Sequence, residues 1–487
     1  MSVPCKTSSA ATKLILVVVL PLIVCSVIIV GRSSFGFSIS LNSSVSENTE
    51  SERPLLTHNE GVLFSTSSNI NGSSSSSSSS QDVFIRSKNV LNSVTISTRA
   101  AKTFSKLQRL EAGLARARAG IRNASQNKTS HEEDRNLLPL RTIYRNRHEF
   151  HQSYLEMEKI FKIFIYEEGS APLFHDGPCK GIYSTEGMFI QGIEFNKHFR
   201  TWDPDRAHVY FLPFSIGKMV RYLYVRDSHD IGPIKRTVVD YANFIARKYP
   251  YWNRSLGADH FILSCHDWAP HTSSYVPYLY KNSIRAFCNA NTSEGFYPSK
   301  DVSFPEINLR KGHLPVIIDG LPPSNRTILA FFAGKLHGTI RIKLLEHWKD
   351  KDEEVVVYER LPKELSYGTM MRKSKFCLCP SGYEVASPRI VEAIYSQCVP
   401  VLLSDHYIPP FSDILNWNSF SVQLSVNDIP NLKKILMGIS EEHYMEMHRN
   451  LKQVRSHFMV NDPPVRFDAF HMTIHSIWLR RLNIRIN

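Results

Sequence analysis

The stretch Lys375–Asp405, KFCLCPSGYEVASPRIVEAIYSQCVPVLLSD, decides the fold that this chain is expected to adopt. An apolar strand ends in a Pro-Ser-Gly turn, and a loop then leads to Ser387 and Pro388, which open a helix followed by a second apolar strand. Serine is a good N-cap residue and proline is favoured at the first helical position. Strand, helix and strand in this order are typical of a parallel sheet covered by helices.

The same alternation continues on both sides and predicts two halves. In residues 155–300 the pattern predicts strands over 162–166, 208–214 and 260–265, and helices over 183–195 and 233–248. In residues 327–465 it predicts strands over 327–332, 354–358, 375–379 and 399–404, and helices over 340–349, 367–373, 388–396, 431–437 and 441–458. A linker is expected over 301–326 and a last helix within 466–487. The predicted architecture is an α/β fold of two Rossmann-like domains with a cleft between them.

The N-terminal part differs from the rest in composition. Residues 14–30 form an uncharged apolar run that is just long enough to cross a bilayer, which takes about 17–25 residues. Lysines precede the run and acidic residues follow it, which places the tail 1–13 in the cytosol and the remainder in the lumen. A cleaved signal peptide is the alternative interpretation. Residues 31–154 are expected to form a luminal stem, because a tract such as Ser73–Ser80 cannot bury apolar surface.

Two features of the predicted stem concern its partners and its cellular compartment. A helix predicted over 100–122 carries apolar residues at heptad-like positions, which leaves open whether it pairs with another chain or is a single amphipathic helix. Seven sequons for N-glycosylation support a luminal location. They lie at Asn42, Asn71, Asn123, Asn127, Asn253, Asn291 and Asn325.

The composition narrows the class of protein. The net charge of +13 suits an acidic partner, but the chain carries no zinc-finger spacing, basic zipper or aromatic RNA-binding consensus, so nucleic acid is not expected. Eight cysteines are too few for a disulfide scaffold in 487 residues. Cys377 and Cys379 lie on one face of a predicted strand and are interpreted as buried thiols, with the pairing of the other cysteines left open.

Charged residues follow the opening of the helix at Pro388. Arg389 lies in its first turn, where it could contact a diphosphate, and Glu392 lies three residues later on the same face, where it could accept hydrogen bonds from ribose hydroxyls. The alternative is a surface ion pair between the two side chains, with Ser387 acting only as a cap.

Six blocks of sequence resemble the exostosin family, glycosyltransferase family 47, and in particular its plant members. They occur in family order from about 160 to 481: FKIFIYEEGSAPLFHDGPCKGIYSTEG, FRTWDPDRAHVYFLPFS, YPYWNRSLGADHFILSCHDW, FFAGKLHGTIR, MMRKSKFCLCPSGYEVASPRIVEAIYSQCVPVLLSDHYIPPF and RFDAFHMTIHSIW. The resemblance implies a GT-B fold on a single-pass Golgi anchor, with the acceptor in the N-terminal domain and the sugar nucleotide in the C-terminal domain. It also implies that Arg389 and Ser387 contact the diphosphate and that Glu392 contacts the ribose.

Two further groups of residues are candidates for the transfer reaction. Lys335 and Arg341 in FFAGKLHGTIR would supply positive charge where a UDP leaving group develops negative charge, unless they are only exposed residues of a connection. His266 and Asp267 follow the strand in GADHFILSCHDW and could take a proton from an acceptor hydroxyl, unless they only cap the sheet edge. His175 and Asp176, in LFHDGP, form a weaker pair of the same kind.

A divalent metal is not expected to be obligatory. The sequence DKD at 350–352 lies in a charged turn and DPD at 203–205 precedes a strand, whereas a metal site of the Asp-x-Asp type would follow an apolar strand. The UDP-sugar is therefore expected as a co-substrate without a further cofactor.

The expected function is transfer of a sugar from a UDP-sugar to a polysaccharide or glycan, with inversion, in cell-wall polysaccharide synthesis in the Golgi. One alternative is a non-catalytic scaffold subunit of a Golgi glycosyltransferase complex, and another is a stalked adhesion protein, which would be rich in strands. The sequence leaves open the sugar, the acceptor, the linkage, the oligomeric state and the identity of the catalytic base.

Overall fold

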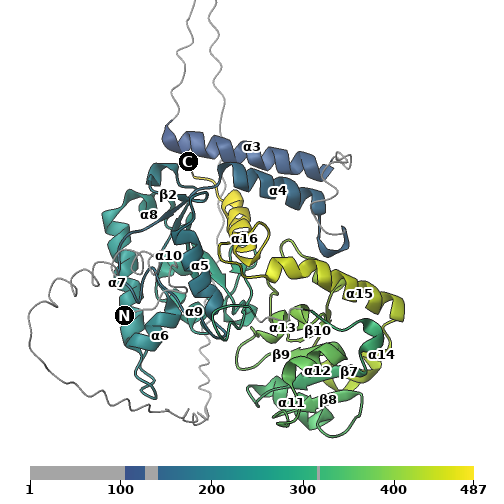
Figure 1. The fold of residues 1–487 in the computed structure, drawn as a ribbon. Helices are drawn as coiled ribbons and strands as arrows, with labels where there is room; N and C mark the ends of the chain where they lie inside the picture. Colours follow the sequence, from purple (N-terminus) through teal and green to yellow (C-terminus); the bar gives the residue numbers. More distant parts are fainter. Residues whose placement is uncertain (1–104, 127–140, 315–318, 487) are drawn as a thin grey trace, which may run out of the picture. The chain divides into compact units, whose positions relative to one another are not determined.

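The computed structural model describes residues 105–126, 141–314 and 319–486 (Figure 1). The expected cytosolic tail, the membrane segment 14–30 and most of the expected stem lie outside these ranges. Within them, every helix is too short or too polar to cross a bilayer.

The first half is built on a six-stranded parallel sheet in the order β2-β1-β3-β4-β5-β6. Its strands are β1 (Ile163–Ile165), β2 (Arg200–Thr201), β3 (Val209–Phe211), β4 (His260–Ser264), β5 (Ile284–Phe287) and β6 (Val302–Ser303). The helices of this half are α5 (Ser184–Glu194), α6 (Ile216–Leu223), α7 (Gly232–Lys248), α8 (Pro250–Ser255), α9 (Ala269–Ser274) and α10 (Pro277–Lys281). Strands that are buried along their whole length, such as β4, explain the uninterrupted apolar runs in the sequence.

The second half is built on a five-stranded parallel sheet in the order β11-β10-β9-β7-β8. Its strands are β7 (Ile328–Ala333), β8 (Val355–Tyr358), β9 (Ser374–Pro380), β10 (Val399–Leu403) and β11 (Val422–Leu424). Its helices are α11 (Thr339–Trp348), α12 (Tyr367–Lys373), α13 (Arg389–Tyr395), α14 (Leu432–Met437) and α15 (Glu441–Val454). The predicted α/β fold with two parallel sheets is therefore confirmed.

The last helix, α16 (Ala469–Asn483), returns to the first half. It lies beside α4 (Arg147–Ile160) and α5 and contacts β5 and β6 (Figure 1). The guanidinium of Arg480 donates from Nε to the carbonyl of Asp301 at 2.9 Å, and that of Arg481 donates from Nε to the carbonyl of His208 at 2.7 Å. Helix α16, near the end of the chain, therefore packs against the sheet of the first half.

Three boundaries differ from those read in the sequence. Helix α4 belongs to the folded part rather than to the stem that was expected to reach residue 154, because Phe150, Tyr154 and Met157 are buried in the core. Strand β6 lies within the expected linker 301–326 and pairs with β5. The helix α13 begins at Arg389, so Ser387 is not its N-cap, and the N-cap residue Pro388 offers no side-chain hydrogen bond.

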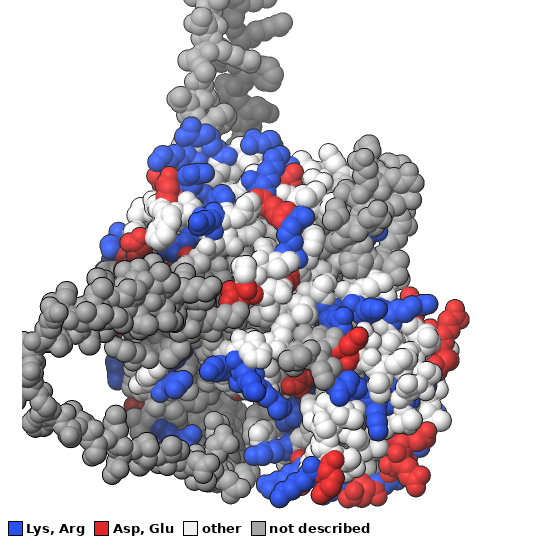
Figure 2. All heavy atoms as spheres, viewed as in Figure 1, with Lys and Arg blue, Asp and Glu red and all other residues white. Residues whose placement is uncertain are grey.

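The helix predicted over 100–122 is described as α3 (Lys106–Gln126). Its apolar residues Leu114, Ala117 and Ile121 are buried within the chain, where α3 packs against α4. The apolar face of α3 is thus buried against α4 of the same chain. The heptad-like pattern therefore no longer argues for a dimer formed through α3. Basic side chains of α3 face solvent at the top of the view in Figure 2.

Two disulfides settle part of the cysteine pairing. Cys265 at the end of β4 is bonded to Cys288 after β5, and Cys377 in β9 is bonded to Cys398 before β10. The interpretation of Cys377 as a thiol was wrong, because the neighbouring strand brings Cys398 to it. Cys379 is a buried free thiol, as expected.

Candidate functional site

A cavity of about 470 Å³ is lined by loops of both halves. Apart from the weaker pair His175 and Asp176, the sequence singled out seven residues for binding or catalysis. Six of these line the cavity: Asp267, Lys335, Arg341, Ser387, Arg389 and Glu392. Residues separated by more than a hundred positions therefore meet in one place. The seventh residue, His266, is not part of the lining.

Two arginines form the basic wall of this cavity. Arg341 in α11 is 7% exposed, and burial, followed by the charge of Arg389, lowers its pKa to about 10. Both side chains have a buried Nε without a hydrogen-bond partner. Their guanidiniums reach only neutral oxygens in the described ranges, with Arg341 donating to the carbonyl of Lys335 at 3.4 Å and Arg389 to that of Ala333 at 3.3 Å. Arg341 is buried and Arg389 is partly buried, and two neighbouring cations of this kind without a carboxylate partner can be stabilised by a bound anion.

Glycines allow the chain to come close to these arginines. A Cβ atom on Gly334 would lie 2.3 Å from Nη2 of Arg389, and one on Gly382 would lie 3.0 Å from Nη2 of Arg341. Gly338 has φ +78°, and a Cβ atom there would lie 2.1 Å from the carbonyl oxygen of Gly382. The loops after β7 and β9 therefore approach each other around the guanidiniums only because side chains are absent.

Glu392 lines this cavity and also a second one of about 600 Å³. Tyr367, Pro388 and Glu392 line both cavities, so the two spaces are adjoining. Apolar side chains of Met371 and Val391 contribute to the second cavity. Burial raises the pKa of Tyr367 above its usual range, and the charge and hydrogen bond of Glu392 act in the same direction. The first, charged cavity and the second, more apolar cavity thus adjoin at the carboxylate of Glu392.

Carboxyl groups also line the cavity. Asp267 accepts a hydrogen bond from the hydroxyl of Tyr183 at 2.6 Å, and burial raises its pKa. Glu306 is 4% exposed, and burial, followed by the charge of Asp267, raises its pKa well above the usual range. Burial, followed by the charge of Glu294, raises the pKa of Glu384 to about 7. Such shifts are typical of functional carboxyl groups.

Sequence reasoning missed Glu306 and Glu384. The available signal for Glu306 was an acidic residue placed three positions after the apolar strand β6, in VSFPEI. Glu384 lies in the loop between β9 and α13, within the stretch 375–405. A loop has no periodic pattern, so the sequence could not predict which way the side chain of Glu384 points.

His266 is held away from the cavity. Its Nδ1 accepts a hydrogen bond from the backbone N–H of Trp268 at 3.1 Å, and its ring lies 4.8 Å from that of Tyr183. Burial lowers its pKa to about 4. The ring therefore supports Tyr183, which in turn holds Asp267.

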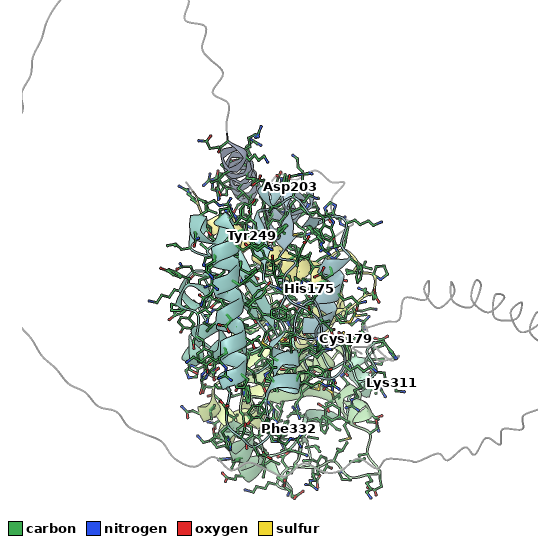
Figure 3. All side chains as sticks on the ribbon, turned by 90° about the vertical axis from the view of Figure 1, so that its left-hand side faces the viewer. His175, Cys179, Asp203, Tyr249, Lys311 and Phe332 are labelled. Carbon is green, nitrogen blue, oxygen red and sulfur yellow. A yellow bond between two sulfur atoms is a disulfide. The ribbon has the colours of Figure 1, made fainter. Side chains whose placement is uncertain are left out.

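The weaker pair lies elsewhere in the first half. Nδ1 of His175 lies 2.6 Å from the carboxyl group of Glu194, and Asp176 forms an ion pair with Lys218 at 2.8 Å. Figure 3 shows His175 well apart from Phe332, whose ring lies 5.3 Å from the guanidinium of Arg389. Both members of the pair are engaged in structural contacts outside the cavity.

The two Asp-x-Asp sequences also lie outside the cavity. Asp352 pairs with Lys433 at 2.7 Å, and Asp205 pairs with Lys106 at 2.7 Å. Among the residues that the structure describes, no three His, Cys, Asp or Glu side chains come together as metal ligands would.

The sequons within the described ranges differ in exposure. Asn123, Asn253 and Asn325 are exposed, whereas Asn291 is 7% exposed and its side chain caps a short helix by accepting from Ser293 N at 3.0 Å. Burial argues against a glycan on Asn291 in the folded chain. Asn42, Asn71 and Asn127 lie outside the described residues.

Comparison with known proteins agrees with the resemblance seen in the six blocks. The family model of the exostosin GT47 domain matches residues 157–439. A "probable glycosyltransferase" of Arabidopsis thaliana is 58% identical over 405 residues, covering 83% of this chain and 78% of the relative. A "probable glucuronoxylan glucuronosyltransferase" of the same plant is 25% identical over 351 residues, covering 65% of this chain and 76% of the relative.

Among solved structures, a glycosyltransferase from Rickettsia africae is 8% identical and covers 60% of this chain and 92% of its own, at a TM-score of 0.27. So low a score has no bearing on the assignment, which depends on the sequence match. The family model covers more than half of the chain, and the relative at 58% identity covers most of it. This chain belongs to the exostosin GT47 family and is a glycosyltransferase.

Proposed function

We propose that this glycosyltransferase moves a sugar from a UDP-sugar to a hydroxyl of a polysaccharide or glycan, in a fold of the GT-B type. The observation that carries the proposal is the pair Arg341 and Arg389, two cations that line one cavity and have no carboxylate partner in the described ranges. A nucleoside diphosphate supplies the missing negative charge. The second half then holds the donor and the first half the acceptor.

The donor fits the two adjoining cavities. Arg341 and Arg389 bind the diphosphate and stabilise the charge that develops on the leaving UDP, with Ser387 and Lys335 at the same wall. Glu392 accepts hydrogen bonds from the ribose, and the uracil ring occupies the second, more apolar cavity. In this arrangement the arginines perform the charge neutralisation that a divalent metal performs in other transferases, so we propose that no metal is obligatory.

Asp267 is the proposed catalytic base. Its carboxylate lines the cavity, and Tyr183 holds it through Oδ2. The acceptor oxygen forms a bond to C1 of the sugar while the bond from C1 to the phosphate oxygen breaks, and the hydroxyl proton passes to Asp267. Attack from the face opposite to UDP inverts the configuration at C1. His266 is a positioning residue in this scheme, because its ring packs on Tyr183.

We further propose that the chain acts in the Golgi lumen on cell-wall polysaccharides, as a single-pass type II membrane protein. The uncharged run 14–30 and the sequons support this topology. The disulfides Cys265–Cys288 and Cys377–Cys398 fit an oxidising compartment. The name of the relative at 25% identity, a glucuronoxylan glucuronosyltransferase, supports a polysaccharide acceptor.

Calorimetry with UDP on the purified full-length chain tests the proposal. The wild type is expected to bind UDP, and Arg389→Met and Glu392→Gln are each expected to weaken binding at least tenfold. The exposed residues Arg360 and Glu364 offer matched controls, Arg360→Met and Glu364→Gln, which should bind as the wild type does.

The same experiment separates a transferase from a scaffold subunit. If the wild type releases no heat on mixing with UDP, the donor site is absent and the scaffold alternative is favoured. If UDP binds but Glu392→Gln binds equally well, the assignment of the ribose contact is wrong.

A further inference from the structure

A cavity of about 480 Å³, the α3 cavity, lies apart from the candidate site. Its lining comes from α3, from the segment around the end of α4 and from a short helical turn, Pro204–Arg206, between β2 and β3. Two of the lining residues are carboxylates, Asp203 and Asp205. Six are cations: Lys106, Arg109, Arg116, Lys159, Lys162 and Arg206. Figure 2 shows cationic side chains gathered over α3, so this face of the molecule is strongly positive.

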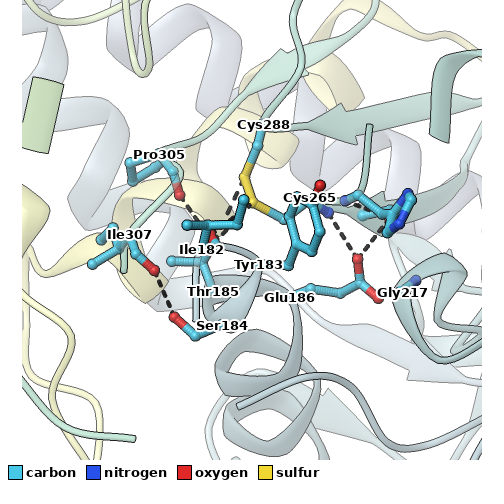
Figure 4. Close-up of a disulfide and its surroundings, with 12 residues drawn as sticks. Ile182, Tyr183, Ser184, Thr185, Glu186, Gly217, Cys265, Cys288, Pro305 and Ile307 are labelled. Carbon is cyan, nitrogen blue, oxygen red and sulfur yellow. Dashed lines mark hydrogen bonds between the residues drawn. A yellow bond between two sulfur atoms is a disulfide. The ribbon is translucent and has the colours of Figure 1, made fainter. Parts of the chain in front are cut away.

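The α3 cavity and the candidate site lie at opposite edges of the first sheet. Lys162 directly precedes β1 and His208 directly precedes β3, so the α3 cavity lies at the amino ends of these strands. Asp267 follows the carboxyl end of β4, beyond Cys265 and its disulfide with Cys288 (Figure 4). The strands β1, β3 and β4 run parallel, and the five residues of β4 span about 16 Å. A group bound in the α3 cavity is therefore out of reach of the sugar that is transferred.

The carboxylates of the α3 cavity are engaged, whereas most of its cations are not. Asp205 pairs with Lys106 at 2.7 Å, and Asp203 accepts a hydrogen bond from the backbone N–H of Asp205 at 3.0 Å. Burial, followed by the charge of Arg206, lowers the pKa of Lys162, because cations that crowd one another repel. In the parts of the chain that the structure describes, four of the cations form no ion pair: Arg109, Arg116, Lys159 and Arg206. A partner with several negative charges would stabilise this cluster.

The spacing of the cations favours an extended partner. Arg109 and Arg116 are seven residues apart in α3, which is about 10 Å along the helix axis. Arginines that bind a single phosphate converge on it, whereas charges spread over this length match a chain of anionic groups. The apolar side chains of the lining, Leu110 and Ile160, are half-buried, so the cavity lacks the exposed apolar anchors with which surface helices insert into a bilayer. These features favour a polyanion over a phosphate ion or a membrane surface.

We propose that the α3 cavity binds a carboxylate-bearing segment of a polysaccharide, at a site distinct from the one where the sugar is transferred. The choice of a polysaccharide rests on the proposed function, whereas the requirement for negative charge rests on the cations alone. A polymer held at this edge of the first sheet keeps its other residues at a high local concentration near the candidate site. The enzyme thereby retains its acceptor between successive transfers.

Calorimetry with a long oligogalacturonate, whose charges are all carboxylates, tests the inference on the full-length chain. The wild type is expected to bind it, more weakly as the salt concentration rises, and not to bind an uncharged oligogalactoside. The double variant Arg109→Gln with Arg116→Gln is expected to weaken binding at least tenfold. Helix α7 offers the matched control, because Arg236 and Arg247 are also exposed arginines of one helix. The double variant Arg236→Gln with Arg247→Gln should bind as the wild type does.

Absence of binding to the wild type would overturn the inference. An equal loss in the two double variants would overturn it as well, because the binding would then reflect the general positive charge of the chain. Vesicles of phosphatidylserine and phosphatidylcholine form a second arm. If the changes at Arg109 and Arg116 abolish vesicle binding but leave oligogalacturonate binding intact, the α3 cavity is part of a membrane surface instead.

The affinity for UDP separates this inference from the proposed function. The changes at Arg109 and Arg116 should leave UDP binding unchanged, and a loss of UDP affinity in this variant would contradict a distinct site. A wild type that binds oligogalacturonate but not UDP would reject the proposed function and retain the anionic site. A wild type that binds UDP but not oligogalacturonate would reject this inference alone.

Discussion

Asn289 of the first half is hydrogen-bonded to Glu384 of the second half. Its Nδ2 donates to Oε2 of Glu384 at 2.5 Å, and its Oδ1 accepts from the backbone N–H of Val385 at 3.2 Å. Asn289 is 1% exposed and follows β5, whereas the two partners lie in the loop that leads to Ser387 and Arg389. One buried amide thus holds the loop between β9 and α13 against the first half.

Removal of this amide should loosen the loop between β9 and α13. In Asn289→Ala, Val385 N–H and the Glu384 carboxyl group both lose a buried partner, which costs about 1–3 kcal/mol of unfolding free energy. We also expect weaker binding of UDP, because the loop carries Ser387 and Arg389. Chemical denaturation and calorimetry measure the two effects. The exposed Asn427→Ala serves as the control, and equal stability and UDP affinity in both variants would show that the contact does not position the loop.

Gly338 tests the close approach of the two loops around the arginines. In Gly338→Ala the new methyl group would lie 2.1 Å from the carbonyl oxygen of Gly382, so the loops must separate. UDP affinity is expected to fall at least tenfold. Gly181 has nearly the same backbone angle, φ +79°, but open space around it. Gly181→Ala therefore carries the strain of positive φ, about 1 kcal/mol, without the clash, and should bind UDP normally. Equal UDP affinity in the two variants would argue against the role of the close approach.

The disulfide Cys377–Cys398 should stabilise the second half. It closes a loop with a sequence separation of 21, for which about 3 kcal/mol is typical. Cys398→Ala is expected to lower the melting temperature, and dithiothreitol should lower that of the wild type. Peptide mapping without reduction should recover Cys377 bonded to Cys398 and Cys379 as a thiol. Recovery of a bond between Cys377 and Cys379 would contradict the described pairing.

Buried histidines should make the chain sensitive to acid. His457 contacts the hydroxyl of Tyr144 at 2.7 Å and the carbonyl of Phe467 at 2.8 Å, and burial lowers its pKa from 6.5 to about 4. Between these two values the unfolded chain binds more protons than the folded chain, so stability falls as the pH falls from 6.5 to 4 and is fully present above 6.5. The contribution of one histidine is at most about 1.4 kcal/mol per pH unit.

Unfolding free energies measured from pH 7 to pH 4.5 check this expectation. His457→Gln cannot titrate, so its stability should depend less steeply on pH than that of the wild type, although the variant is less stable at pH 7. His406 is exposed, and His406→Gln should keep the steep dependence. A wild-type slope that persists in His457→Gln would assign the acid sensitivity to other groups.

The sequence predicted secondary structure best where a local pattern of apolar residues coincides with burial. Every strand predicted in the second half is present, because strands buried on both faces, such as β9 and β10, appear as short continuous apolar runs. Short edge strands such as β2 and β6 were missed, since two residues carry no periodicity. Helix α4 was missed because its apolar side chains become a core only against α3 and α16.

The residues of the candidate site likewise fall into those that the sequence predicted and those that only packing identified. Lys335, Arg341, Ser387, Arg389 and Glu392 could be named from the sequence because they lie in two strand-to-helix segments. The diphosphate and ribose roles of Ser387, Arg389 and Glu392 followed from the family resemblance. His266 and Asp267 are neighbours in the same loop, and the sequence could not tell which one faces the cavity. The packing of Tyr183 decides it, because its ring packs against that of His266 and its hydroxyl donates to the carboxylate of Asp267.

The sequence by itself thus determined the order of strands and helices, the parallel sheets and the positive charge at the ends of the second set of strands, because these depend on residues close together in the chain. Only the tertiary structure decided that Glu306 and the two arginines line one cavity and that Asn289 holds the loop between β9 and α13. Those relationships join segments that are far apart along the chain, and they exist only when burial brings the two sheets and their loops together.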